Sequence, residues 1–543
     1  MPLTTTNVKG WEMERLAHQE PSDVVAYKRA GWWGDTTVGD AVAQWSAVKG
    51  DADALVADGL RATWADYDAR ATALAHALVR AGLPRGGRAA VLLPDGVAVH
   101  VAFVAAERAG VTVVGIGHRA GDRELRHILG ATGATGIVTL AEQRGAPATE
   151  LVEALRADGL GLAHHVVVNA DGTVDDPGGP SVDLSSRAYG ADDLFLLNST
   201  SGTTGMPKVV MHNQNRWMYF HQLAAEAGGM TGDDVFLGAL PAPFGFGLWT
   251  SHVTPGVLGA TTVVSARFDA DEALRLVERE RVTVLGCVST QFLMMLGSPL
   301  VEQLDLTSLR CMFTGGEAVP AERAARFEDV TGCKVLQFYG SNETGALSRT
   351  TLEDDRDHRF RTAGRLIADM HVRLLDDDDH DLTEPGVPGN PVCKGPATSF
   401  GYLDDPAANE QLFTADGWMR IGDRCVLDDD GYLRVVGRTS DLIIRGGKNI
   451  SAPAVEAEVS THPAISVAAA VPVPDDVFGE RVGIFVELVD GASLELDDLV
   501  AHLRARGVSP EWLPERLVVL DELPRASGGK VAKRELRTRA LDL

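Results

Sequence analysis

Glycines, hydroxyls and a lysine coincide in one stretch of ten residues, a combination that can hold phosphate. Residues 199–208 read Ser-Thr-Ser-Gly-Thr-Thr-Gly-Met-Pro-Lys. Glycine lets the backbone approach a ligand closely, and loop N–H groups beside hydroxyls can form a nest for anions. Lys208 adds one positive charge. The stretch predicts a phosphate-binding loop, and the alternative is a polar surface loop.

This loop is not a Walker A motif, and it follows a candidate strand. A Walker A motif ends in Gly-Lys-Ser/Thr, whereas Pro207 precedes Lys208 and Val209 follows it. The apolar run at 194–197 is short enough for a buried strand. The loop then leaves a strand end, where open α/β sheets usually bind ligands.

Six later stretches combine glycines with carboxylates, an aromatic residue or a lysine. They read Thr-Gly-Gly-Glu-Ala at 314–318, Tyr-Gly-Ser-Asn-Glu at 339–343, Trp-Met-Arg-Ile-Gly-Asp at 418–423, Gly-Arg-Thr-Ser-Asp at 437–441, Gly-Gly-Lys-Asn-Ile at 446–450 and Pro-Arg-Ala-Ser-Gly-Gly-Lys at 524–530. Taken alone, a lysine in a glycine loop near a C-terminus is usually just solvated.

In this order, the loop and the later stretches resemble the acyl-adenylate-forming superfamily. That group comprises acyl- and aryl-CoA synthetases, the adenylation domains of peptide synthetases, and beetle luciferases. The resemblance covers nearly the whole chain. It implies that ATP and Mg²⁺ activate a carboxylic acid to an acyl-AMP, and that a thiol such as coenzyme A then displaces AMP.

The resemblance also implies roles for individual residues. Lys530 and Glu343 would be catalytic, with Glu343 holding Mg²⁺. The residues implied to bind ATP or AMP are Thr200, Ser201, Gly202, Thr203, Thr204, Lys208, Gly316, Glu317, Ala318, Tyr339, Asn342, Asp423 and Arg438. The residues implied to face the coenzyme A tunnel are Gly446, Gly447 and Lys448, and the implied hinge is Ser440.

Three positions depart from the family pattern. Asn342 and Ile421 stand where threonine is usual, and Ser440 stands where Asp or Lys is common. An amide can still donate to a phosphate oxygen, so Asn342 is expected to alter the geometry without abolishing function. Ile421 has no donor, and Ser440 remains a candidate pivot with Asp441 as its neighbour.

The acid pocket is expected around residues 243–249. The candidate lining residues are Phe244, Phe246, Ser289, Gly315 and Gly340. Many relatives carry histidine at the place of Phe244, and amino-acid-activating relatives place an aspartate near this stretch, which this chain lacks. An apolar or aryl acid without an amino group is therefore expected. The alternative is that Phe244 and Phe246 pack in the core.

Several readings of the function remain open. No carrier domain follows the small domain, so free coenzyme A is the expected acceptor. A free-standing enzyme that loads an acyl or aryl acid onto the pantetheine of a carrier protein is the alternative. A luciferase-like oxygenase would reveal itself by light or oxygen uptake. Intact Glu343 and Lys530 argue against a non-catalytic binding protein.

Alternating strand and helix patterns predict the scaffold that must position these residues. From Thr63, residues Tyr67, Ala71, Leu74 and Leu78 share one helix face. The strands expected at 89–93, 111–114 and 136–140 alternate with helices at 97–109 and 123–130. This order predicts a doubly wound α/β sheet, while residues 1–60 read as irregular.

The fold class expected is α/β with two domains. A large N-terminal domain of doubly wound sheets should span 1–439 and include a small β subdomain at about 365–436. A small, mobile C-terminal α/β domain should span 440–543, with strands at 468–473 and 484–488. The resemblance implies that it rotates about the hinge between the two half-reactions.

Composition excludes several partners. The 543 residues carry a net charge of −26 without a basic cluster, which argues against nucleic acid and anionic membranes. No apolar run reaches about 18 residues, so no membrane span is expected. The five dispersed cysteines lack metal-ligand spacing, which is typical of reduced thiols in a cytoplasmic protein.

Overall fold

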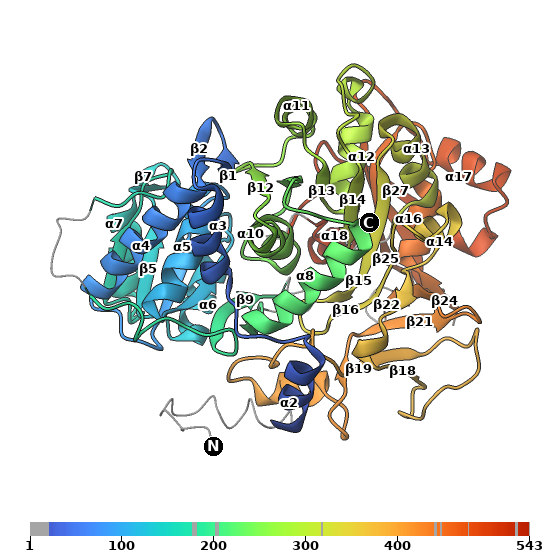
Figure 1. Cartoon of the computed structure of the whole chain (residues 1–543). Coiled ribbons are helices and arrows are strands. Elements are labelled where there is room, and N and C mark those ends of the chain that lie inside the picture. Colours follow the sequence, from blue (N-terminus) through green and yellow to red (C-terminus); the bar gives the residue numbers. More distant parts are fainter. Residues whose placement is uncertain are drawn as a thin grey trace.

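The computed structural model describes most of the chain, as shown in Figure 1. The described residues are 21–175, 182–200, 206–316, 319–438, 442–445, 448–475, 477–526 and 530–541. Two large sheets with their helices make up the greater part of the structure, and the C-terminal α/β unit, red in Figure 1, packs beside the second sheet.

The first sheet has six strands in the order β10-β9-β4-β3-β5-β8. Its strands are β3 (Arg88–Leu92), β4 (Thr112–Gly115), β5 (Gly136–Thr139), β8 (His164–Val167), β9 (Leu194–Ser199) and β10 (Val209–Asn213). Only β10 runs antiparallel to its neighbour. The connecting helices include α4 (Trp64–Arg80), α5 (Val97–Ala109), α6 (Asp122–Thr132) and α7 (Ala148–Ala157). The predicted alternation of strands and helices is confirmed.

The second sheet has nine strands in the order β17-β16-β15-β14-β13-β11-β12-β1-β2. They are β1 (Asp53–Ala57), β2 (Leu60–Thr63), β11 (Val235–Gly238), β12 (Thr261–Val264), β13 (Val284–Gly286), β14 (Cys311–Gly315), β15 (Lys334–Ser341), β16 (Gly345–Arg349) and β17 (Arg365–Leu366). The strands from β1 to β15 in this order pair in parallel, and β2, β16 and β17 are antiparallel edges. The sheets are therefore mixed at their edges.

Successive side chains of the parallel strands pack into separate hydrophobic cores. In β14, Cys311 and Phe313 join a central core, whereas Met312 joins an outer one. In β3, Val91 faces the same central core and Leu92 an outer one. Successive residues of a strand point to opposite faces, so each sheet is covered on both sides, as parallel sheets require.

The helices form three layers around the two sheets. The central layer contains α4, α5, α3 (Val38–Lys49), α8 (Gln214–Gly228) and α10 (Thr254–Leu258). The outer layers contain α6 and α7 on the first sheet, and α11 (Ala270–Glu280), α12 (Ser289–Gly297) and α13 (Ala321–Thr331) on the second.

The expectation that residues 1–60 are irregular is wrong for the described part of that segment. It contains α2 (Pro21–Ala30), α3 and β1. The helix α3 begins at a capping box in which Thr37 Oγ1 accepts from Asp40 N, and the Asp40 carboxylate accepts from Thr37 N. Such a box satisfies two backbone donors, and its pattern is readable in the sequence.

The region after the second sheet is a set of short antiparallel strands. They are β18 (Val372–Leu375), β19 (Asn390–Cys393), β20 (Met419–Arg420), β21 (Asp423–Leu427) and β22 (Leu433–Arg438). The helix α15 (Pro406–Leu412) lies between β19 and β20 in the chain. This arrangement is the small β subdomain expected from the sequence.

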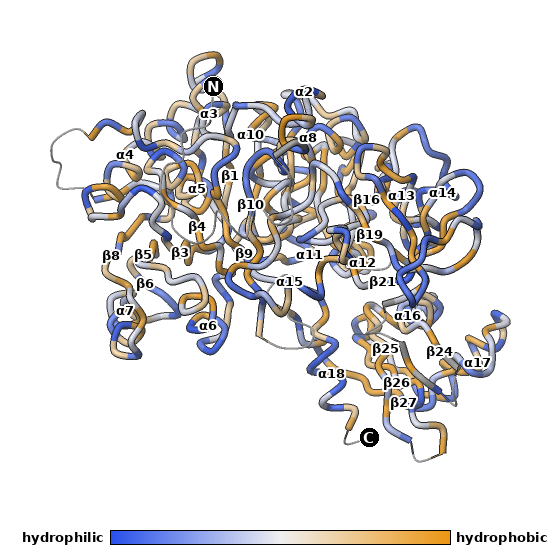
Figure 2. The backbone as a smooth tube through the Cα atoms, turned by 90° about the horizontal axis from the view of Figure 1, so that it is seen from below, coloured by the Kyte–Doolittle hydropathy of each residue, from blue (hydrophilic) through white to orange (hydrophobic). Residues whose placement is uncertain are grey.

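The C-terminal unit has its own sheet and core. Its strands are β23 (Leu442–Arg445), β24 (Lys448–Ser451), β25 (Ile465–Asp475), β26 (Gly479–Leu488) and β27 (Arg516–Val519), and its helices are α16 (Ala452–Val459), α17 (Leu496–Ala505) and α18 (Lys533–Ala540). Apolar strands gather with these helices at one end of the molecule in Figure 2. The predicted boundary at 439/440 falls outside the described residues and stays a prediction. Among the described helices, none is long and apolar enough to cross a bilayer.

Candidate functional site

The candidate phosphate loop joins two antiparallel strands, β9 and β10. Its two ends are bonded to each other: Thr200 N donates to Lys208 O over 2.9 Å, and Lys208 N donates to Thr200 Oγ1 over 3.2 Å. The central residues Ser201, Gly202, Thr203 and Thr204 lie outside the described residues. The structure therefore fixes the base of the loop at the end of the first sheet.

An unpredicted tyrosine lies against the loop lysine. The segment 400–403 extends the first sheet, because Phe400 N donates to Met211 O over 3.1 Å and Leu403 N donates to Val209 O over 2.8 Å. This pairing brings Tyr402 beside Lys208, whose Nζ lies 4.8 Å from the ring centroid. No periodicity or motif in the sequence marked Tyr402.

The predicted metal carboxylate contacts the same tyrosine. Glu343 lies on the turn between β15 and β16, where Ser341 Oγ accepts from the N–H groups of Glu343 and Thr344 over 3.2 and 3.1 Å. Tyr402 Oη donates to Glu343 Oε1 over 2.7 Å. The loop lysine and the carboxylate thus contact the same phenol, the lysine over its ring and the carboxylate at its hydroxyl.

Asn342, which replaces the usual threonine, bonds to a second amide. Its Nδ2 donates to Asn198 Oδ1 over 2.7 Å, and Asn198 Nδ2 lies 3.3 Å from Asn342 Oδ1. Asn198 also donates to Pro243 O over 3.0 Å. The amide pair therefore connects β9, the Glu343 turn and the candidate acid-pocket segment.

Two buried residues of β10 and α8 support this pair. His212 Nε2 donates to Asn198 Oδ1 over 2.7 Å, and Arg216 donates to His212 Nδ1. Burial, followed by the charge of Arg216, holds the pKa of His212 well below its ordinary value, so the imidazole is neutral. Asn198 is a polar residue in an apolar strand, which is the one sequence signal that pointed here.

Arg216 anchors the backbone of the metal turn. It is 2% exposed and donates to Ala397 O over 2.7 Å, Asn342 O over 2.9 Å and Glu343 O over 3.4 Å. Burial lowers its pKa to about 9, so it remains charged at neutral pH. A buried cation that binds neutral acceptors marks a region where anions are favoured.

The predicted adenine-side and ribose-side residues lie together. Tyr339 Oη donates to Asp423 Oδ2 over 2.8 Å. Burial raises the pKa of Tyr339 well above its ordinary value, so the phenol stays a donor. Asp423 begins β21, opposite Arg438 of β22. The side chain of Arg438 lies outside the described part.

Lys530 reaches the large domain from the C-terminal unit. Its Nζ donates to the Gly316 carbonyl oxygen over 3.0 Å. Gly316 has φ +75°, and a Cβ there would lie 2.5 Å from Lys530 Nζ. Glycine is thus required both by the backbone conformation and by the approaching lysine. The neighbouring candidates Glu317 and Ala318 lie outside the described residues.

The candidate pocket residues include two aromatic side chains and one polar side chain. Phe244 is half-buried and precedes α9 (Gly245–Leu248), while Phe246 packs edge-on against Trp249 at 5.3 Å between ring centroids. Ser289 is buried, and its hydroxyl has no hydrogen-bond partner among the described residues. A buried hydroxyl without a partner is unusual and is a polar group that a bound acid could satisfy.

At both predicted pocket glycines, neighbouring backbone atoms leave no room for a side chain. A Cβ at Gly315 would lie 2.4 Å from Phe338 O, and one at Gly340 would lie 1.8 Å from Gly345 O. Gly245 lies within the expected pocket stretch 243–249, and a Cβ there would lie 3.1 Å from both Asn342 Oδ1 and Trp217 Cη2. A side chain at this position would therefore crowd both groups.

The coenzyme A and hinge candidates remain untested by the geometry. Ser440, Gly446 and Gly447 lie outside the described residues. Lys448 begins β24, and its side chain is likewise not described.

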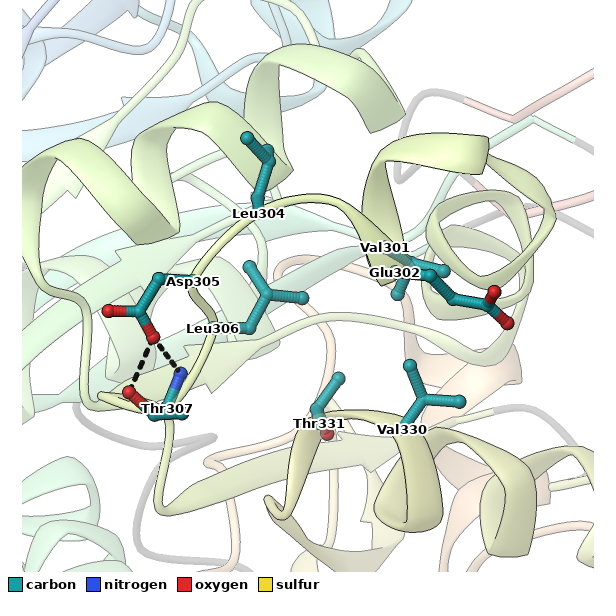
Figure 3. Close-up of a pocket in the computed structure, with 8 residues that line it drawn as sticks. All are labelled: Val301, Glu302, Leu304, Asp305, Leu306, Thr307, Val330 and Thr331. Atoms are coloured by element: carbon teal, nitrogen blue, oxygen red, sulfur yellow. Dashed lines mark hydrogen bonds between the residues drawn. The ribbon is translucent and has the colours of Figure 1, made fainter.

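A separate surface cavity of about 350 Å³ lies on the large domain beside the second sheet, and Figure 3 shows the residues that line it. It is lined by Val301, Glu302, Leu304, Asp305, Leu306, Thr307, Val330 and Thr331. The Asp305 carboxylate accepts hydrogen bonds from the backbone N–H and the hydroxyl of Thr307. None of the candidate site residues lines this cavity, and its two carboxylates would repel a nucleotide.

Comparisons with known proteins agree with this geometry. The family model for the AMP-binding enzyme matches residues 42–403, and the model for the AMP-binding enzyme C-terminal domain matches 454–530. A 2-hydroxy-7-methoxy-5-methyl-1-naphthoate–CoA ligase from Streptomyces carzinostaticus is 32% identical over 96% of both chains.

One further sequence relative and one solved structure are also similar to this chain. A salicyl-AMP ligase/salicyl-S-ArCP synthetase from Mycobacterium tuberculosis is 34% identical, over 95% of this chain and 93% of that one. The crystal structure of the anthranilate CoA ligase AuaEII matches with a TM-score of 0.84 and 23% identity, over 94% of this chain and 97% of that one. The chain therefore belongs to the AMP-binding enzymes of the acyl-adenylate-forming superfamily.

Proposed function

We propose that the protein activates an apolar or aryl carboxylic acid, not an amino acid, with ATP and then transfers the acyl group to coenzyme A. The products would be acyl-CoA, AMP and pyrophosphate. The observation that carries this proposal is the contact of Lys530 with Gly316 O at 3.0 Å. It brings an ammonium from the C-terminal unit to the side of the large domain that holds the candidate nucleotide residues.

The described residues supply groups for each part of ATP. Tyr339 and Asp423 would bind the adenosine, and Thr200 and Lys208 would bind phosphate oxygens. Lys530 would offset the charge that develops when the acid carboxylate attacks the α-phosphate. Catalysis of this kind depends on positioning and on preorganised charge.

Glu343 fits a magnesium ligand. Among the described residues, its carboxylate hydrogen-bonds only to Tyr402 and forms no ion pair. Mg²⁺ is usually held by one or two carboxylates together with substrate phosphates and water, which matches one carboxylate beside a phosphate loop. When bound, Mg²⁺ would neutralise phosphate charge during the first half-reaction.

The acid is proposed to be aromatic. Phe244 and Phe246 offer half-buried rings, and residues 243–249 contain no carboxylate to hold an ammonium. The unpartnered hydroxyl of Ser289 favours an acid with a polar substituent. Relatives named for hydroxynaphthoate and salicylate are consistent with this class.

Loading of a carrier protein is the second candidate for the acceptor step. It is favoured by the relative named as a salicyl-S-ArCP synthetase, which is 34% identical. In either case we propose that domains 1–439 and 440–543 rotate about Ser440, so that Gly446, Gly447 and Lys448 face the pantetheine. A cytoplasmic setting is also inferred, since the five cysteines are buried and none forms a disulfide.

Acid-dependent pyrophosphate release from a panel of aryl and aliphatic acids tests the proposal. Glu343→Gln should lower the rate by about 10²-fold or more, as for loss of one preorganised electrostatic group. Glu353→Gln, at an exposed position on the same domain, is the matched control. Transfer from the best acid to coenzyme A or to a purified carrier protein then separates the two acceptors. Absence of pyrophosphate release with every acid would refute the proposal.

A further inference from the structure

Lys208 and Glu343 carry opposite charges, and both contact the side chain of Tyr402. Lys208 Nζ lies 4.8 Å from the centroid of the Tyr402 ring, and Glu343 Oε1 accepts from Tyr402 Oη over 2.7 Å. Within the described part of the chain, Lys208 and Glu343 form no ion pair with each other. Two such charges at the base of one site would otherwise attract each other strongly.

The position of Tyr402 is fixed by its backbone and by its burial. Its N–H donates to Asn409 Oδ1 and its carbonyl accepts from Asn409 Nδ2, each over 2.8 Å. It is also bridged to Val210 of β10, directly after the loop. The side chain is 7% exposed. The side chain therefore has little freedom to leave its contacts with Lys208 and Glu343.

The phenol is suited to hold a carboxylate without neutralising it. A phenol is protonated at neutral pH and donates one hydrogen bond, and Tyr402 Oη gives that bond to Glu343 Oε1 over 2.7 Å. It occupies one of the two carboxylate oxygens and leaves the other for a cation. On its face, the aromatic ring attracts the Lys208 ammonium without compensating its charge.

We infer that Tyr402 is a positioning residue that keeps Lys208 and Glu343 apart, leaving the ammonium for phosphate and one carboxylate oxygen for Mg²⁺. This inference rests on the proposed function, which assigns those two residues to the nucleotide and the metal. A ring that only packed in the central core would have no effect on metal or nucleotide affinity beyond its effect on folding.

Equilibrium binding of α,β-methylene-ATP, titrated by calorimetry at several Mg²⁺ concentrations, tests the inference without turnover. Tyr402→Phe keeps the ring and removes the hydroxyl. It should raise the Mg²⁺ concentration for half-maximal nucleotide binding by about 10-fold, as for loss of a group that orients a metal ligand. Nucleotide affinity at saturating Mg²⁺ should stay unchanged.

Tyr402→Leu removes the spacer as well and should allow an ion pair between Lys208 and Glu343. Nucleotide affinity should then fall about 10-fold even at saturating Mg²⁺. In the double variant Tyr402→Leu, Glu343→Gln the lysine should be released, so that metal-free nucleotide binding recovers to the level of Glu343→Gln alone. Tyr432→Phe removes a comparable phenol–carboxylate bond, to Asp354 outside the site, and is the matched control.

The outcomes separate the two proposals. If the wild-type chain shows neither Mg²⁺-dependent nucleotide binding nor acid-dependent pyrophosphate release, the proposed function fails. If the wild type shows both activities, and folded Tyr402→Phe needs the same Mg²⁺ concentration as the wild type for half-maximal nucleotide binding, only the positioning role is overturned. The hydroxyl is inferred to act through the Glu343 carboxylate, so Tyr402→Phe should change the Mg²⁺ requirement little when Glu343 is already Gln. If Tyr402→Phe raises the Mg²⁺ requirement of Glu343→Gln as much as it raises that of the wild type, the positioning role is also overturned.

Discussion

Lys530 Nζ donates to the carbonyl oxygen of Gly316 over 3.0 Å, although 214 positions separate them. Gly316 follows the last residue of β14, at the carboxyl end of a parallel strand. Open α/β sheets bind ligands at this end of their strands. The contact therefore describes an arrangement of the two parts of the chain in which the lysine faces the candidate nucleotide site.

Lys530→Ala should abolish most of the adenylation step and spare the thioester step. Loss of one preorganised donor typically costs 10²–10³ in rate, roughly 2.7–4 kcal/mol. The variant should still convert supplied acyl-AMP and coenzyme A to acyl-CoA. Lys533→Ala, which breaks the pair with Glu456 inside the C-terminal unit at 2.7 Å, is the control and should retain both steps.

Gly447→Leu should show the reverse pattern if the glycine turn faces the thiol. It should release pyrophosphate at a near-normal rate and form little thioester. Both half-reactions need separate assays on folded protein. Equal loss of both steps in Lys530→Ala and in Gly447→Leu would exclude a scheme in which the C-terminal domain presents two faces.

Arg323 joins the two parts of the chain by contacts that the proposed domain rotation would break. It donates to the carbonyl oxygens of Ser460 over 3.0 Å and of His462 and Ile465 over 3.3 Å each. Arg323→Ala should slow adenylation several-fold, because it removes hydrogen bonds specific to this arrangement. Thioester formation from supplied acyl-AMP should stay equal or become faster.

Arg326→Ala is the matched control for Arg323→Ala. Arg326 lies on the same helix and pairs with Glu302 at 3.4 Å within the large domain, where both side chains are more than half exposed. Exposed pairs contribute about 0–1 kcal/mol, so both half-reactions should be unaffected. A loss of both steps in Arg323→Ala, in proportion to a lower melting temperature, would assign that residue a stabilising role only.

The sequence was most informative where a repeated local pattern determines structure. Strand and helix alternation identified β3, β4, β5, α4 and α5, because burial on both sheet faces leaves long apolar runs. Short motifs marked Lys208, Glu343 and Asp423 as candidate site residues, and these assignments stay predictions.

The residues that connect those motifs could not be predicted in the same way. Asn198 meets Asn342 across 144 positions, and Tyr402 meets Glu343 across 59. Arg216 reaches Ala397 across 181 positions. These contacts depend on how two sheets pack, and no periodicity within one segment encodes that packing. The helix α3 differs from these contacts, because its capping box of Thr37 and Asp40 is a local pattern within the sequence.

Phe244 and Phe246 should respond differently to truncation. Phe244 is half-buried and belongs to none of the apolar clusters of the described residues, whereas Phe246 packs against the central core through Trp249. Phe244→Ala should shift acid preference toward bulkier rings with little change in melting temperature. Phe246→Ala should lower stability, by less than the roughly 3–5 kcal/mol of a fully buried ring. Competition between two acids of different width, together with thermal melts, distinguishes the two residues. An unchanged preference in Phe244→Ala together with a large drop in melting temperature would show that this ring serves packing and not the acid.

Buried histidines should make the protein sensitive to acid. His100 and His252 stack with ring centroids 5.5 Å apart, and both side chains are almost fully buried. Burial lowers the pKa of His100 to about 3; burial, followed by the charge of His100, lowers that of His252 well below its ordinary value. Below the unfolded-state pKa of about 6.5, the unfolded chain binds protons that the folded chain does not.

The free energy of unfolding should therefore fall as the pH decreases from 6.5, by up to about 1.4 kcal/mol per pH unit for each such histidine. The contribution of His100 should stop changing only near pH 3, where its folded form protonates. His252→Asn removes one titrating group and should flatten the dependence between pH 6 and pH 5. His380→Asn, at a side chain that is 77% exposed, should leave the dependence unchanged. Denaturant melts at pH 8, 6.5, 5.5 and 5 measure these slopes, and equal slopes for wild type and a folded His252→Asn would show that His252 protonates without unfolding.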